Sequence, residues 1–143
     1  MKNVNLFVYG SLIEGFFNYD KYLKGKVVEK RAAKLENMQL YHMPYKGYPA
    51  ILKGQNSILG EIMVINEDNY EATMEAMDKM EGFISENNPE NEYHKIVLEV
   101  KNLQTNEKEK CFVYFYNKDK DKVFDSESVY IPNGDWKEYM LTK

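Results

Sequence analysis

Alternating hydrophobic and polar positions predict several strands along this chain. The clearest strand runs from Ile58 to Ile65, where Ile58, Ile62 and Val64 share one face. The other expected strands are Asn5 to Tyr9, Ala32 to His42, Ala50 to Leu52, Tyr93 to Val100 and Lys110 to Tyr116. The connection between the last two strands, from Asn102 to Glu109, suits a hairpin.

One segment has a helical period with start and stop signals at its ends, from Glu67 to Glu81. Asn66 can cap its start, and the acidic Glu67 and Asp68 suit the positive end of the helix dipole. Gly82 stands where a glycine commonly ends a helix. Strands at short spacing with one dominant helix predict an α+β domain built on a strongly curved sheet or small barrel.

Size and charge narrow the class of protein. The 143 residues suit a single domain, residues 1–143, with a substantial core. A net charge of −4 argues against nucleic acid as the main partner. A single cysteine, Cys111, allows no intrachain disulfide and is typical of a reducing cytoplasm. Neither a signal peptide nor an apolar run of membrane-spanning length is present, so we expect a cytoplasmic protein without a membrane partner.

The loop after the first predicted strand is a candidate anion-binding site. The apolar strand ends at Tyr9 and runs directly into Gly10 and Ser11, followed by Leu12. Glycine tolerates backbone angles that other residues avoid, so we expect a sharp turn there. The consecutive N–H groups of such a turn can point one way and bind a carboxylate or an oxyanion. An ordinary strand followed by a Gly-Ser turn explains the same residues.

Glu81 lies at the end of the predicted helix that disfavours a carboxylate. The helix dipole places partial negative charge there, which costs a glutamate about 0.3–1 kcal/mol. Burial between Met80 and Phe83 would raise the pKa of Glu81, and such a carboxyl group serves as a general acid or base. The alternative is a solvent-exposed glutamate that tolerates the small penalty. Asp78, one turn earlier, could form a carboxylate pair with it, although a surface position is the commoner outcome.

Other reactive residue types lack the spacing that their chemistry requires. Ser11 does not stand in the Gly-x-Ser-x-Gly pattern of a nucleophile elbow. His42 and His94 are expected on or beside strands, and Cys111 adjoins an apolar run that suits packing. These residues have no metal-ligand spacing, and no glycine-rich phosphate loop is present. We therefore expect no metal or organic cofactor.

Short motifs follow one another along nearly the whole chain. They are Val8-Tyr9-Gly10-Ser11-Leu12, Gly47-Tyr48-Pro49-Ala50, Leu59-Gly60-Glu61-Ile62, Met77-Asp78-Lys79-Met80-Glu81-Gly82, Tyr93 at the start of a strand, Phe112-Val113-Tyr114 and Gly134-Asp135-Trp136. In this order they resemble the γ-glutamylcyclotransferase-like superfamily, which includes the γ-glutamylamine cyclotransferases. Tyr-Gly-Ser-Leu followed by Asp-x-x-Glu-Gly is the most specific combination.

The resemblance implies a small mixed β-barrel with one main helix packed alongside. It also implies a pocket between the first loop and the end of that helix. In that family the backbone N–H groups of the loop hold the substrate, here at Tyr9, Gly10, Ser11 and Leu12. The glutamate of the Glu-Gly pair is the catalytic acid and base, here Glu81.

The reaction implied by the resemblance cuts a γ-glutamyl amide by cyclisation. The α-amine of the glutamyl group attacks its own γ-carbonyl, which gives 5-oxoproline and a free amine or amino acid. Glu81 would accept a proton from the α-amine and return it to the leaving amine. Tyr93 and Tyr114 are candidates for the pocket wall. The attack is intramolecular, so no protein nucleophile is required.

One position departs from the family pattern, and two other functions remain open. Tyr93-His94-Lys95 stands where relatives often have Tyr-x-Arg, and lysine lacks the planar bidentate fork of arginine. Substrate specificity can therefore differ. A non-catalytic module that binds small carboxylates on the same scaffold is the first alternative. A serine hydrolase at Ser11 is the second, although no base is visibly placed for it.

Overall fold

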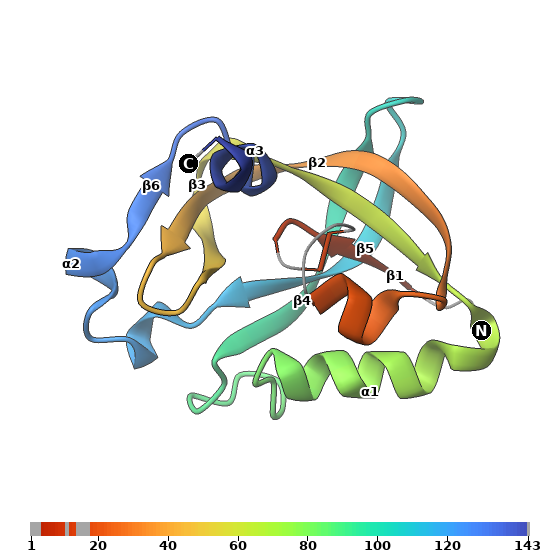
Figure 1. Cartoon of the computed structure of the whole chain (residues 1–143), viewed down its shortest axis with the longest axis horizontal. Helices are drawn as coiled ribbons and strands as arrows, with labels where there is room; N and C mark the ends of the chain where they lie inside the picture. Colours follow the sequence, from red (N-terminus) through yellow and green to blue (C-terminus); the bar gives the residue numbers. More distant parts are fainter. Residues whose placement is uncertain (1–3, 11, 14–17, 143) are drawn as a thin grey trace.

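The strands of the computed structural model close into a small barrel (Figure 1). The structure describes residues 4–10, 12–13 and 18–142. The barrel strands are β1 (Asn5–Val8), β2 (Val27–Met43), β3 (Tyr48–Ile65), β4 (Tyr93–Asn102) and β5 (Lys108–Tyr116). Their order is β3-β1-β5-β4-β2, and pairing of β2 with β3 closes the barrel. Only the β1–β5 pair is parallel among the described strands, so the barrel is mixed, as expected.

Strands β2 and β3 are longer than the sequence predicts. The expected strands Ala50 to Leu52 and Ile58 to Ile65 are parts of the single strand β3, which pairs with β2 along nearly its whole length. The polar segment between them stays in the sheet because a bulge at Met38 sets that residue opposite both Lys53 and Asn56. Backbone pairing to β2 thus compensates for the weak strand pattern of this segment.

The predicted helix is present in two parts. A single 3-10 turn, Glu67–Asn69, leads into α1 (Tyr70–Met80), and the Asn66 side chain accepts a hydrogen bond from the Asp68 N–H at 2.9 Å. Helix α1 runs along one side of the barrel (Figure 1). Its buried residues are Tyr70, Thr73, Met74 and Met77. The helix therefore packs one face on the barrel and brings its C-terminal end to the opening beside β4.

Several short elements were not predicted from the sequence. They are α2 (Phe124–Glu127), β6 (Val129–Ile131) and α3 (Trp136–Leu141). The π-helical turn Tyr19–Leu23 lies in a segment for which the sequence predicts a short helical or irregular stretch, and the 3-10 turn Lys118–Lys120 lies where the sequence predicts a turn. None is long enough to establish a period in the sequence. Trp136 at the start of α3 is 1 % exposed, and its Nε1–H donates to His42 Nδ1 on β2 at 3.1 Å. This contact fixes the C-terminal segment to the barrel.

The remaining reactive residue types lie where the sequence places them. His42 is in β2 and His94 is in β4. Cys111 in β5 is fully buried, and burial raises the pKa of its thiol to about 12. Cys111 therefore serves in packing, as expected. Across the described part of the chain, no helix has the length and hydropathy needed to cross a membrane.

Candidate functional site

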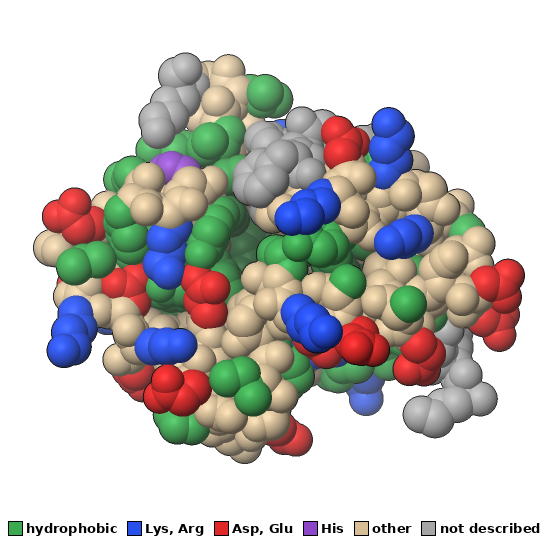
Figure 2. Space-filling model, turned by 60° about the horizontal axis from the view of Figure 1, so that its bottom comes forward, with side chains coloured by type: hydrophobic (Ala, Val, Ile, Leu, Met, Phe, Trp, Pro, Cys, Tyr) green, Lys and Arg blue, Asp and Glu red, His purple; other side chains and the backbone are tan. Residues whose placement is uncertain are grey.

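The predicted site residues that the structure describes line one cavity. Its volume is about 310 Å³, within the range of small-molecule sites. The predicted site residues that line this cavity are Tyr9, Gly10, Leu12, Glu81, Tyr93 and Tyr114. Ser11 lies outside the described residues. Figure 2 shows a hollowed face with hydrophobic side chains in the hollow and charged side chains of both signs beside it. The loop after β1 and the end of α1 thus meet at one cavity.

A Schellman motif ends α1 and determines where Glu81 lies. The N–H of Gly82 donates to the carbonyl of Lys79 at 3.2 Å, and the N–H of Phe83 donates to that of Asp78 at 2.8 Å. Gly82 has a φ of 69°, the left-handed conformation that this motif requires and that glycine adopts without strain. Glu81 is therefore the last residue before the chain reverses, as the sequence predicts.

The backbone of Glu81 is held between α1 and β4. Its N–H donates to the Met77 carbonyl at 2.9 Å, and its carbonyl accepts from the Tyr93 N–H at 3.1 Å. The next pair continues this pattern, because the Glu92 N–H donates to the Gly82 carbonyl at 3.0 Å. The side chain thus projects from a backbone that is fixed on both sides, which limits its reorganisation during a reaction.

The environment of Glu81 favours the neutral carboxylic acid. Glu81 is half-buried, and it lines the cavity. Burial raises the pKa of Glu81 to about 8, and the negative charges of Glu92 and Asp78 contribute to the rise. A carboxyl group with this pKa can exchange a proton near neutral pH.

This raised pKa makes a prediction about stability. The unfolded chain releases the Glu81 proton near pH 4.5, whereas the folded chain holds it up to about pH 8. The folded state therefore loses stability relative to the unfolded state as the pH rises from 4.5 to 8. Glu81→Gln removes this loss, so its free energy of unfolding should exceed that of the wild type by about 1–3 kcal/mol at pH 8. The difference should shrink toward pH 4.5, as measured by urea denaturation at each pH.

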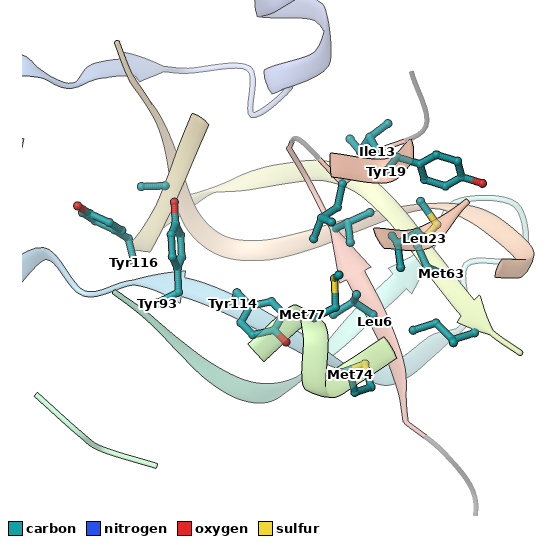
Figure 3. Packing of buried hydrophobic residues seen from close by; sticks show 14 of the residues in the cluster. Leu6, Ile13, Tyr19, Leu23, Met63, Met74, Met77, Tyr93, Tyr114 and Tyr116 are labelled. Carbon is teal, nitrogen blue, oxygen red and sulfur yellow. The ribbon is translucent and has the colours of Figure 1, made fainter. Parts of the chain in front are cut away.

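Asp78 forms several contacts next to the end of α1. From the sequence, a surface position was the commoner expectation for this residue. The Tyr114 hydroxyl donates to Asp78 Oδ1 at 2.6 Å, and Lys95 Nζ lies 3.1 Å from the same oxygen. The Tyr9 hydroxyl donates to the backbone carbonyl of Tyr114 at 2.7 Å. Figure 3 shows Tyr114 next to Met77 of α1. These contacts tie the end of α1 to β5 and to the residue before the loop.

Lys95 braces Asp78 at the end of α1. Its ammonium group also lies 4.3 Å from the centre of the Phe112 ring, a cation–π contact. Lys95 is not one of the residues that line the cavity. Lys95 therefore contacts the site through Asp78 and does not form part of the cavity wall.

Replacing Asp78 should change the titration of Glu81. Asp78→Asn removes one negative charge that raises the pKa of Glu81 and leaves a carbonyl oxygen to accept from Tyr114. We expect the Glu81 pKa to fall by a fraction of a unit, as followed by ¹³C NMR of the glutamate carboxyl groups. Asp68→Asn, on the exposed turn at the other end of the helix, is the control and should leave it unchanged. An equal shift in both variants would contradict this assignment.

The expected turn at Gly10 is present, and glycine is required there because of a close contact. Gly10 is not among the residues with positive φ, so it does not adopt the left-handed conformation. A β-carbon at Gly10 would overlap the Pro49 ring, lying 2.8 Å from Cδ and closer still to Cγ. The Tyr93 hydroxyl donates to the Pro49 carbonyl at 2.5 Å. The loop therefore packs directly on a proline that β4 holds in place.

The loop also offers backbone donors that have no partner among the described residues. The N–H of Ile13 donates to the Gly10 carbonyl at 2.9 Å, which closes the turn. The N–H groups of Gly10 and Leu12 donate to no other residue within the described ranges. Both residues line the cavity, so these donors are available to an anionic group of a ligand.

The cavity contains charged residues that sequence reasoning missed. Glu92 Oε2 accepts from the Tyr48 hydroxyl at 2.5 Å and from Lys46 Nζ at 2.9 Å. Lys21 and Asn18 also line the cavity. Glu92 and Lys46 directly precede two of the sequence motifs but lie outside regular elements, so no periodicity marks them. Within the described ranges, no group of three or more His, Cys, Asp or Glu side chains is arranged to hold a metal ion.

Comparison with known families identifies the class of protein. The family model described as gamma-glutamyl cyclotransferase, AIG2-like, matches residues 6–138. The chain belongs to this family. A comparison with curated protein sequences finds no match. Membership in the gamma-glutamyl cyclotransferase, AIG2-like family agrees with the resemblance of the motifs and with the barrel.

Solved structures support the same fold. An uncharacterised protein of Pyrococcus horikoshii is 24% identical with a TM-score of 0.62, and the match covers 98% of this chain and 95% of that one. YtfP of Escherichia coli is 22% identical with a TM-score of 0.59, over 95% and 98% of the two chains. An AIG2-like protein of Mus musculus is 21% identical with a TM-score of 0.57, over 78% and 76%. At these identities the likeness concerns the fold alone.

Proposed function

We propose that this protein is a γ-glutamyl cyclotransferase that releases 5-oxoproline and a free amine or amino acid from a γ-glutamyl amide. One observation carries the proposal: Glu81 and the loop containing Gly10 and Leu12 line the same cavity. Family membership supports the substrate class. The proposed partner is thus a small molecule, and the chemistry described below requires no cofactor.

The first step activates the substrate amine. Near neutral pH the α-amine of a γ-glutamyl compound is largely an ammonium ion, which cannot attack a carbonyl. The ionised form of Glu81 accepts a proton from it as a general base. A carboxyl group with a pKa of about 8 holds that proton far better than one with the usual pKa of 4.5, so the transfer is less uphill.

The second step closes the ring and releases the leaving group. The neutral α-nitrogen attacks the γ-carbonyl carbon, forming the new carbon–nitrogen bond of 5-oxoproline. The bond from that carbon to the leaving nitrogen then breaks as Glu81 returns the proton. Overall, two protons pass from the α-nitrogen to the leaving nitrogen, and neither water nor a protein nucleophile is consumed.

The loop supplies the electrostatic part of the mechanism. The N–H groups of Gly10 and Leu12, which have no partner among the described residues, hold the substrate α-carboxylate or the oxyanion that develops on the γ-carbonyl. Losing one such preorganised donor costs about 10²–10³-fold in rate in studied enzymes. Tyr93 and Tyr114 form the wall against which the glutamyl chain folds, and holding it folded brings the amine to the carbonyl.

The test is turnover of a panel of γ-glutamyl amines and γ-glutamyl amino acids, with 5-oxoproline detected by mass spectrometry. The proposal predicts enzyme-dependent 5-oxoproline from at least one compound. Thermal stabilisation by γ-glutamyl compounds without turnover of any of them would instead establish the non-catalytic binding module. Labelling of Ser11 by a serine-directed phosphonate would support the hydrolase alternative.

A further inference from the structure

A second cavity adjoins the candidate active site. It has a volume of about 510 Å³ and opens on the side of the barrel formed by the turn before β3 and the segment after β5. Its lining residues are Tyr45, Lys46, Glu92, Tyr116, Asn117, Lys120, Asp121, Lys122 and Val123. Lys46 and Glu92 also line the first cavity. The Lys46–Glu92 ion pair therefore forms a shared wall between the two cavities.

Lys46 is held in place but retains hydrogen-bonding capacity. Its ammonium group lies 2.9 Å from Glu92 Oε2, and the two side chains are each 29% exposed. The same group lies 5.9 Å from the centre of the Tyr48 ring and 5.8 Å from that of Tyr116. A lysine ammonium has three donors, and Lys46 uses one of them on Glu92 among the described residues. The others are available to a ligand that passes this wall.

The acidic residues of the second cavity already accept hydrogen bonds from protein groups. Asp121 Oδ2 accepts from the hydroxyls of Tyr45 and Tyr116, each at 2.6 Å, and its Oδ1 accepts from the Val123 N–H at 3.0 Å. Glu92 is engaged by Lys46 and Tyr48.

Two more lysines add positive charge to this cavity. Lys120 Nζ donates to the Glu90 carbonyl at 2.7 Å and forms no ion pair with another described residue. Lys122 is exposed and forms no ion pair with another described residue. The second cavity is thus lined by three lysines and by two carboxylates, Glu92 and Asp121, whose oxygens already accept hydrogen bonds. The excess of positive charge suits a ligand carboxylate.

We propose that the second cavity is the subsite for the leaving group, and that Lys46 selects amines that carry a carboxylate at their far end. This inference rests on the proposed function, because it assigns the part of the substrate beyond the scissile amide. The γ-glutamyl group occupies the first cavity beside Glu81. The leaving chain then crosses the Lys46–Glu92 wall, and its carboxylate accepts from the Lys46 ammonium.

The test compares two series of γ-glutamyl amides of matched length. In one series the leaving amine is an unbranched ω-amino acid, and in the other it is the alkylamine without the carboxylate. We expect kcat/KM of the wild type to favour the carboxylate series by about tenfold at one chain length or more, as a charge-assisted hydrogen bond provides. Lys46→Met should abolish this preference, mainly by raising KM for the carboxylate series.

Controls separate the role of Lys46 from general damage. Lys46→Arg keeps the charge and should retain the preference, and Lys137→Met, on the exposed face of α3, should leave it unchanged. Equal kcat/KM for the two series in the wild type, or a preference that survives Lys46→Met, would overturn the subsite while 5-oxoproline release stands. If neither series yields 5-oxoproline, the proposed function is overturned, and the subsite with it.

Discussion

Glu81→Gln lowers the rate of 5-oxoproline release by about 10²–10⁴-fold, the usual contribution of a positioned acid or base. The amide has nearly the size of the carboxyl group but cannot accept the substrate proton. The hydrogen bonds from residue 81 to Met77 and Tyr93 are made by the backbone, so the end of α1 should stay in place in this variant. The measurement is steady-state kinetics with mass detection of 5-oxoproline across pH 6 to 10.

The matched control for this variant is Glu75→Gln. Glu75 lies on α1 with a side chain that is 75% exposed, outside the candidate site. Its replacement also removes one negative charge from the helix and should leave the rate unchanged. A loss of rate only in Glu81→Gln is then not an effect of the helix charge. An unchanged rate in Glu81→Gln would contradict the assigned role of this residue as acid and base.

Gly10→Val lowers the rate by more than about 100-fold, whereas Ser11→Ala lowers it only a few-fold. A valine side chain would overlap the Pro49 ring, so the loop must move and its N–H groups leave their positions. Loss of one oxyanion donor alone costs about 10²–10³-fold in rate, and the overlap costs about 1–3 kcal/mol of stability. The Ser11 hydroxyl has a secondary role in this account, because the proposed donors are backbone groups.

Folding must be measured alongside these rates. Thermal unfolding and far-ultraviolet circular dichroism establish whether each variant keeps the barrel. Gly10→Ala adds a single methyl group at the same contact and should fall between the wild type and Gly10→Val in rate. The opposite ranking, with Ser11→Ala the more damaging change in folded proteins, would contradict the proposal that the backbone donors of this loop act on the substrate.

The fold was largely predictable because its main elements carry local signals. Side-chain alternation predicted the strands, and Asn66 and Gly82 marked the two ends of the helical segment, as the cap and the Schellman motif confirm. The merging of two predicted strands into β3 was not predictable. That strand continues through a polar stretch only because β2 pairs with it around the bulge at Met38.

The candidate site was predictable in part. A glutamate at the unfavourable end of a helix singled out Glu81, and the motif order connected it to the Gly10 loop. The pairing of Glu92 with Lys46 gave no signal, because it joins two loops that are 46 positions apart in the chain. The role of Gly10 was also hidden, since its contact with Pro49 arises only when the barrel closes. Local patterns thus predicted the groups on regular elements, whereas contacts between loops required the structure.

In the proposed mechanism, the protein uses the substrate's own amine to cleave a γ-glutamyl amide, and Glu81 moves the proton. The most direct test is turnover of an active γ-glutamyl compound in H₂¹⁸O, followed by mass analysis of both possible products. Intramolecular attack predicts 5-oxoproline without ¹⁸O, formed only when enzyme is present. Glutamate carrying one ¹⁸O atom in its carboxyl groups would show that water attacks the amide, and would contradict the account.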